Sequence, residues 1–205
     1  MIYFRDKKPV TCPEGKPGIN IRPVAVGLPE DKVYYLWSKG LGQSSPAKLS
    51  PHEMSITSDG SIIPKGSTSP MSITFCSFAK GEARVIVLMT EDKSIIAYGK
   101  VMSYPIQAKH GNSRIWVELM TTTGDLFAIY GEGFEPNEEL EITSDSEGEV
   151  AKYKSEADGN GRFINMLLPA VVGKESGVVT YTVVAKVGTL TVSFEWGPPA
   201  LRSGP

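Results

Sequence analysis

The two histidines are the first side chains to consider for catalysis, because imidazole is the commonest acid–base group in enzymes. His52 stands in the segment 50–53 and His110 in the segment 109–111, and neither belongs to a nucleophile or zinc-protease motif. We expect both in solvated loops. A glycosidase-type carboxylate pair would meet only in the folded chain, and nothing singles one out. The sequence therefore predicts a protein that is not an enzyme and has no cofactor.

The acidic stretch 144–149 clusters hard oxygen ligands, from Asp145, Glu147 and Glu149. Such ligands suit Ca²⁺. The stretch lacks the alternating aspartates and the distal glutamate of a calcium-binding loop, whereas Asp, Ser and Gly are ordinary turn residues. We therefore expect a solvated hairpin turn and no metal, with these three carboxylates as the alternative calcium site.

Cys12 and Cys76 are the only cysteines. Two cysteines are too few for a disulfide-built scaffold. They could form one bridge that ties the N-terminal segment to the following domain. The alternative is a buried, inert Cys76 with a free thiol at Cys12. Neither has a histidine or a second cysteine at the spacing of metal ligands.

Composition excludes several classes of function. The 205 residues are 40% hydrophobic and 21% charged with a formal net charge of -2, which is typical of a globular protein. The basic residues are scattered, so we expect no nucleic-acid partner. No apolar run reaches the roughly 20 residues of a transmembrane segment, and the N-terminus lacks the apolar core of a signal peptide.

Short β-rich runs separated by turn residues predict an all-β fold. The expected strands are 20–26, 32–38, 71–78, 83–90, 94–103, 114–120, 126–132, 139–144, 151–155, 162–168, 178–187 and 189–196. No segment has a sustained apolar pattern at helical spacing. A weak internal repeat of roughly 100 residues indicates two copies of one domain.

The predicted organisation is an extended N-terminal arm (1–18), a diverged first domain with longer loops (19–107), a second domain (112–198) and a C-terminal tail (199–205). The residues between the domains form a short linker. The second half carries the clearest turn motifs, in 130–138 and 157–163. In these, Gly133-Phe134 permits a bulge and Asp158-Gly159 favours a tight turn.

These two motifs resemble the "G-x-GF-x-P-x-E" opening and the "A-D-x-x-G-x-F" hairpin of bacterial immunoglobulin-like modules of the IPT/TIG type. The resemblance covers about 85 residues of the second half well and the first half poorly. It implies two tandem immunoglobulin-like antiparallel β-sandwich domains. It also implies a place outside the cytoplasm, either secreted, periplasmic or at the cell surface. Tyr181 is the candidate for the hydroxyl-to-backbone bond of a tyrosine corner.

Alternation assigns the faces of the strands. In the second domain Tyr181, Val183, Leu190 and Phe194 share one face, and the residues between them are largely polar. In the first domain the strands are apolar on both sides. There we place Val33, Tyr35 and Trp37 inward, with Trp196 also inward in the second domain.

The residues assigned to outward faces give the candidate partner site. Leu36, Ile86 and Leu88 are expected to form an exposed apolar patch for a protein partner or for self-association. Trp116 is expected to point outward near the domain junction, where an interdomain contact is favoured over a ligand site.

The sequence thus favours a non-catalytic structural or interaction module that spaces, displays or binds a protein partner. The alternative is a carbohydrate-binding or enzyme-accessory module, which would expose coplanar aromatic rings, including Tyr34 and Trp116.

Overall fold

The computed structural model describes residues 1–202 and 204, and these form two compact units. Unit 1 comprises residues 1–78 and 83–103, and unit 2 comprises residues 79–82 and 104–205. Within the described residues all regular structure is antiparallel β-sheet apart from two short 3₁₀ turns, η1 (Pro13–Gly15) and η2 (Pro198–Leu201). The predicted all-β class is confirmed.

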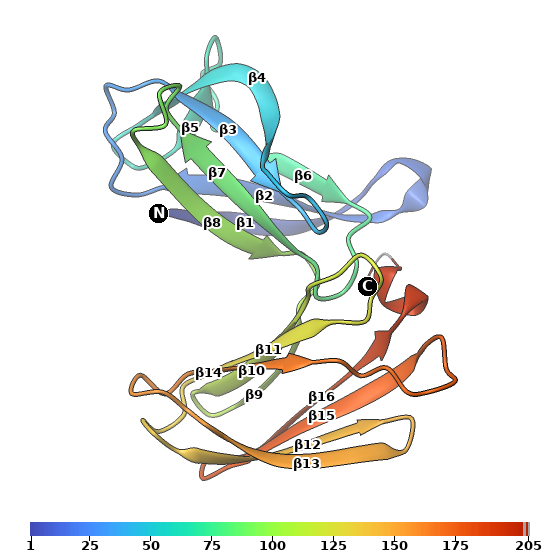
Figure 1. The fold of residues 1–205 in the computed structure, drawn as a ribbon. Coiled ribbons are helices and arrows are strands. Elements are labelled where there is room, and N and C mark those ends of the chain that lie inside the picture. Colours follow the sequence, from blue (N-terminus) through green and yellow to red (C-terminus); the bar gives the residue numbers. More distant parts are fainter. Residues whose placement is uncertain (203, 205) are drawn as a thin grey trace. The chain divides into compact units, whose positions relative to one another are not determined.

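Unit 1 contains two sheets, in the blue-to-green part of Figure 1. Their orders are β1-β2-β6 and β5-β4-β3-β7-β8. The strands are β1 (Ile2–Thr11), β2 (Pro17–Ala25), β3 (Tyr34–Lys39), β4 (Ala47–Ile56), β5 (Ile62–Pro64), β6 (Ile73–Cys76), β7 (Ala83–Met89) and β8 (Ile96–Met102).

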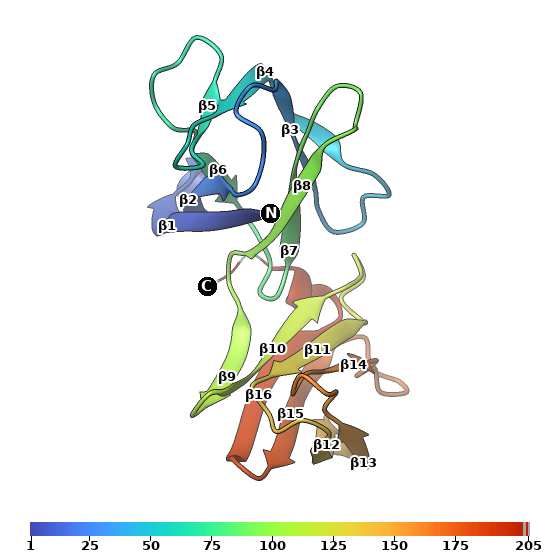
Figure 2. The same ribbon diagram turned by 90° about the vertical axis from the view of Figure 1, so that its left-hand side faces the viewer.

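Unit 2 also contains two sheets, which Figure 2 shows as separate layers. Their orders are β14-β11-β10-β9 and β13-β12-β15-β16. The strands are β9 (Ile106–His110), β10 (Ser113–Leu119), β11 (Phe127–Glu132), β12 (Glu139–Ser146), β13 (Glu149–Glu156), β14 (Phe163–Leu167), β15 (Gly177–Ala185) and β16 (Gly188–Trp196).

The two units share one strand order. The sheet β1-β2-β6 matches β10-β11-β14, and β4-β3-β7-β8 matches β13-β12-β15-β16. Each unit has one additional edge strand, β5 in unit 1 and β9 in unit 2. In both units the chain crosses from one sheet to the other and returns, which is the connectivity of a Greek key. The weak sequence repeat therefore corresponds to a repeated topology.

The N-terminal segment is not a separate arm, contrary to the sequence prediction. β1 pairs with β2 from Ile2 to Thr11, with an irregularity between Arg5 and Lys8. Its Pro9 is tolerated because β1 is the edge strand of its sheet, where an amide hydrogen is not needed on the outer side. The Pro and Lys content that indicated an arm is instead the composition of a protected edge.

The predicted linker is also a strand. β9 pairs with β10, with His110 opposite Ser113 and Ile106 opposite Val117. The change from unit 1 to unit 2 falls between Ser103 and Tyr104, and the short segment 79–82 belongs to unit 2. β4 and β5 were not predicted either, because the polar and proline-rich residues around Pro51 and Pro64 are typical of loops.

The core of unit 2 lies between its two sheets. The Phe127 and Phe194 rings approach to 4.8 Å from opposite sheets, and Phe134 and Phe163 pack at 5.4 Å. Tyr181 and Val183 are fully buried, and Trp196 is nearly so. The predicted inward face of this unit is confirmed.

The hydroxyl-to-backbone bond expected of Tyr181 is found at another tyrosine. Tyr34 donates its hydroxyl hydrogen to the carbonyl of Pro29, five residues earlier, at 2.8 Å. The Tyr181 hydroxyl instead accepts hydrogen bonds from Asn165 Nδ2 and from the Tyr153 hydroxyl. Tyr34 therefore fastens the chain ahead of β3, and Tyr181 links the two sheets of unit 2.

Candidate functional site

The predicted apolar patch is wrong, because the faces of β3 and β7 are reversed. Leu36, Ile86 and Leu88 are completely buried, and so is Tyr34, the predicted sugar platform. Tyr35 and Trp37 lie on the opposite face and are half-buried. Both faces of these strands are apolar, so alternation defined two faces without indicating which one the second sheet covers.

The exposed side of the five-stranded sheet gives unit 1 an apolar surface, which we call the outer face. Tyr98 pairs across strands with Val87, and Val87 pairs with Trp37. In the next row Ile96 pairs with Met89, and Met89 with Tyr35. The outer face comprises Tyr35, Trp37, Val85, Val87, Met89, Ile96 and Tyr98.

Lysines surround the outer face. Lys39 and Lys100 flank Val85 on the neighbouring strands, and Lys48 stands opposite Trp37 on β4. The Lys48 ammonium lies 4.2 Å from the centre of the Tyr35 ring, which is a cation–π contact. The surface thus combines an aromatic and aliphatic centre with a basic margin.

Tyr98 and Ile96 were missed as site residues, although β8 carried a signal for them. They are 67% and 55% exposed, and they alternate with the buried, small Ala97 and Gly99. A strand whose small residues point inward has little room on its inner side. The large residues of such a strand must then point to solvent.

A second surface feature is a groove in unit 2, which we call the Trp116 groove. Trp116 and Tyr130 are cross-strand neighbours, and their rings stack at 5.3 Å with 9° between their planes. The Arg114 guanidinium lies 4.8 Å from the Trp116 ring and pairs with Glu132 at 2.8 Å. The described ring contacts of Trp116 thus lie within unit 2.

The other wall of the groove is polar. It is formed by Glu156, Asp158 and Arg162, whereas the exposed Ile164 is the cross-strand neighbour of Tyr130. Asp158 accepts hydrogen bonds from the backbone amides of Asn160 and Arg162 at 2.8 and 3.0 Å, and these bonds lower the pKa of its carboxyl group. The groove has a volume of about 830 Å³.

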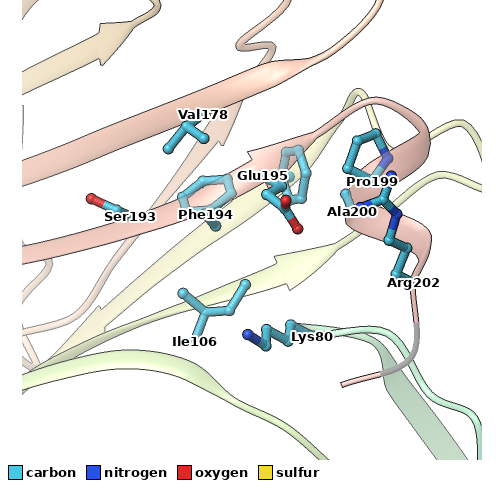
Figure 3. A pocket seen from close by; sticks show the side chains of 10 residues that line it. Lys80, Ile106, Val178, Ser193, Phe194, Glu195, Pro199, Ala200 and Arg202 are labelled. Atoms are coloured by element: carbon cyan, nitrogen blue, oxygen red, sulfur yellow. The ribbon is translucent and has the colours of Figure 1, made fainter. Parts of the chain in front are cut away.

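A smaller cavity of about 440 Å³ lies elsewhere in unit 2 (Figure 3). Phe127, Phe194 and Ile106 supply apolar lining, and Lys80, Glu195 and Arg202 supply charges. In Figure 3 the Lys80 side chain lies beside Ile106, and Arg202 lies beside Pro199 and Ala200. Among the described residues that line it there is no histidine or cysteine, and Glu195 is the single carboxylate.

The three candidate calcium ligands lie at the hairpin between β12 and β13. Asp145 accepts a hydrogen bond from the Gly148 amide at 3.0 Å. Glu147 pairs with Lys174 at 2.8 Å and accepts from the Val178 amide at 2.7 Å, and both interactions lower its pKa. Within residues 1–202 and 204 no group of three or more His, Cys, Asp and Glu residues is placed to hold a metal ion.

The cysteines and histidines complete the predicted site residues. Cys12 and Cys76 form a disulfide, which the sequence had left open. The bridge joins the end of β1 to the end of β6, across the intervening β2. His52 and His110 are exposed as predicted, but they stand on β4 and β9 rather than in loops.

No protein-family model matches the chain, and no curated protein matches it either. Among solved structures, one similar chain is described as "Crystal structure of tetra-tandem repeat in extending region of large adhesion protein". The alignment has 12% identity and covers 96% of this chain and 48% of the other. Its TM-score of 0.29 is too low to establish a shared fold. This chain thus spans about half the length of that structure. In the described part of the chain, no helix has the length and apolarity needed to cross a membrane.

Proposed function

We propose that this chain consists of two tandem immunoglobulin-like β-sandwich domains and acts as a non-catalytic interaction module. Its outer face on unit 1 binds a protein partner, and its setting is outside the cytoplasm. The repeated strand order supports the classification, because two antiparallel sheets joined by Greek-key connections are the layout of immunoglobulin-like sandwiches.

The observation that carries the binding proposal is the contrast between equivalent faces of the two units. The sheet β13-β12-β15-β16 matches the unit 1 sheet, but the centre of its outer side carries hydroxyl pairs, Thr180 with Ser193 and Thr182 with Thr191. Its exposed valines, Val178 and Val184, stand near the two ends of β15. On the equivalent strands β3, β7 and β8, unit 1 carries Trp37, Val87 and Tyr98. A solvated sheet needs no such residues, whereas exposed tyrosine and tryptophan are typical of interface hot spots.

The disulfide supports the proposed location. Structural disulfides persist in oxidising compartments and are rare in the cytosol. The Cys12–Cys76 bridge joins two strands of one sheet in unit 1, which is a structural position.

The test compares the wild-type chain with Tyr98→Glu. Sedimentation velocity first measures self-association, because a second copy is one candidate protein partner. The immobilised chain is then incubated with secreted and surface proteins of its source, and each retained protein is purified and titrated. We expect Tyr98→Glu to weaken the specific complex at least about tenfold, since loss of a hot-spot residue costs about 2 kcal/mol or more and tyrosine is enriched among hot spots.

Thr182→Glu provides the matched control, because it places the same charge on the equivalent polar face of unit 2. We expect it to leave the affinity unchanged. The proposal fails if the wild type neither self-associates nor binds a purified protein, or if Tyr98→Glu and Thr182→Glu have the same effect.

A further inference from the structure

We propose that the Trp116 groove of unit 2 is a carbohydrate-binding site for glycans without acidic groups. The proposal concerns a different unit and a different surface from the proposed protein-binding face, so it does not depend on that function. It rests on the lining residues of the groove, on their charges and on its size.

The aromatic wall suits the apolar side of a sugar ring. Trp116 and Tyr130 are held in a stacked pair on adjacent central strands, so their rings are fixed before a ligand arrives. Arg114 restrains the pair further through its contact with Trp116 and its ion pair with Glu132. A fixed aromatic surface gives apolar contact area at little entropic cost.

The polar wall suits the hydroxyl groups of a sugar. Glu156 and Arg162 are exposed and line the groove together with the aromatic pair, and they supply an acceptor and a donor. The turn that carries Arg162 is held by the hydrogen bonds to Asp158. Apolar contact on one side and directional polar groups on the other is the usual composition of a small-molecule site.

Charge selects among glycans. The groove lining contains three carboxylates, Glu132, Glu156 and Asp158, and one cation, Arg162. Glu132 is neutralised by Arg114, which leaves two carboxylates against one guanidinium. An acidic sugar would meet net repulsion there, so neutral glycans fit the groove better.

The size of the Trp116 groove and its openness to solvent suit the binding of part of an oligosaccharide better than the binding of an enclosed small metabolite. The volume of about 830 Å³ lies in the upper part of the range for ligand sites. Its walls come from the exposed side of the sheet β14-β11-β10-β9 and from the turn before β14. A longer chain can therefore enter and leave the groove across the surface.

The test is isothermal titration of the intact protein with three neutral oligosaccharides, of cellulose, xylan and chitin type, and with an acidic oligogalacturonate. We expect at least one neutral ligand to bind and the acidic one to bind more weakly or not at all. Tyr130→Ala and Glu156→Gln should each weaken binding about tenfold or more, because they remove ring contact and a charged hydrogen-bond acceptor.

Glu156→Gln keeps the size of an exposed side chain, so it tests the site without endangering the fold. The controls are Glu195→Gln, an exposed carboxylate of unit 2 outside the groove, and Tyr98→Glu on unit 1, and both should bind glycan like the wild type. The proposal is overturned if no neutral oligosaccharide binds at millimolar concentration. It is equally overturned if the acidic ligand binds best, or if Glu156→Gln binds like the wild type. If no neutral oligosaccharide binds while Tyr98→Glu still weakens a protein complex, the glycan site falls and the proposed function stands.

Discussion

Aspartate-centred turns recur in this chain with the same residues at the same spacing. In 57–61 and 90–94 an aspartate lies two residues after a threonine and two before a serine. Asp92 accepts hydrogen bonds from the Thr90 hydroxyl at 2.6 Å and from the Ser94 hydroxyl at 2.8 Å and amide at 3.1 Å. These bonds favour the charged carboxylate and lower the pKa of Asp92 to about 2.

The depressed pKa of Asp92 predicts an acid-dependent loss of stability. Between pH about 4 and pH about 2 the unfolded chain binds a proton at this aspartate and the folded chain does not. The stabilisation is therefore complete above that pH and is lost as the pH falls through about 2. Asp92→Asn cannot titrate, so its urea midpoint should fall less between pH 5 and pH 2 than that of the wild type. Glu91→Gln is the control, and an equal fall for Asp92→Asn and wild type would contradict the prediction.

The buried hydroxyl of Tyr181 is expected to contribute to the stability of unit 2. Its side chain is completely buried, burial raises its pKa, and its hydroxyl accepts from Asn165 Nδ2 at 2.9 Å. Tyr181→Phe leaves that amide hydrogen without its partner, so the free energy of unfolding should fall by about 1–2 kcal/mol. Urea denaturation measures this loss. Tyr153→Phe removes a longer bond of 3.3 Å from a partly exposed residue and should cost less.

The packing of β8 on β1 explains why small residues occupy the inner side of β8. A Cβ atom on Gly99 would overlap the carbonyl oxygen of Ile2, which is backbone and cannot rotate away. Gly99→Ala should therefore lower the free energy of unfolding by about 1–3 kcal/mol. Gly159→Ala is the matched control, since a Cβ there meets nothing within 4 Å, and its effect should stay within about 0.5 kcal/mol. Equal effects in denaturation experiments would show that this close approach does not constrain β8.

The strands expected in unit 1 are present, but the sequence did not indicate which of their faces is buried. All twelve expected strands are present, because β-branched and aromatic runs between turn residues identify strands locally. The direction of their faces did not follow, since Leu36 and Trp37 are both apolar and only the position of the sheet β1-β2-β6 decides which is covered. In unit 2 the intervening threonines, serines and glutamates made the same assignment correct.

The disulfide affects the two units of the molecule differently, because it closes a long loop in unit 1 and none in unit 2. Cys12 and Cys76 are 64 positions apart. In the chain-entropy model, removing a bridge that closes a loop of that length lowers the free energy of unfolding by about 4 kcal/mol. Each unit has its own core between its own sheets. In calorimetry the Cys12→Ser/Cys76→Ser double variant should therefore lower the transition of unit 1 and leave that of unit 2 in place.

Tyr181→Phe assigns the two transitions, since it alters only unit 2. If the double cysteine variant shifts both transitions together, the units do not unfold separately and the prediction is wrong.

The sequence by itself determined the all-β class, the twofold repeat, most strands and the inward face of unit 2, because these depend on local turn chemistry and on polar–apolar alternation. The tertiary structure alone decided three things. It placed β1 and β9 in sheets, joined Cys12 to Cys76, and put Tyr98 on the same sheet face as Trp37 and Tyr130 next to Trp116. Cys12 meets Cys76 because β2 pairs with β6, which is far away along the chain, where local patterns carry no information about the pairing. β1 and β9 pair with the next strand, β2 and β10, and it was their polar and proline-containing composition that indicated an arm and a linker.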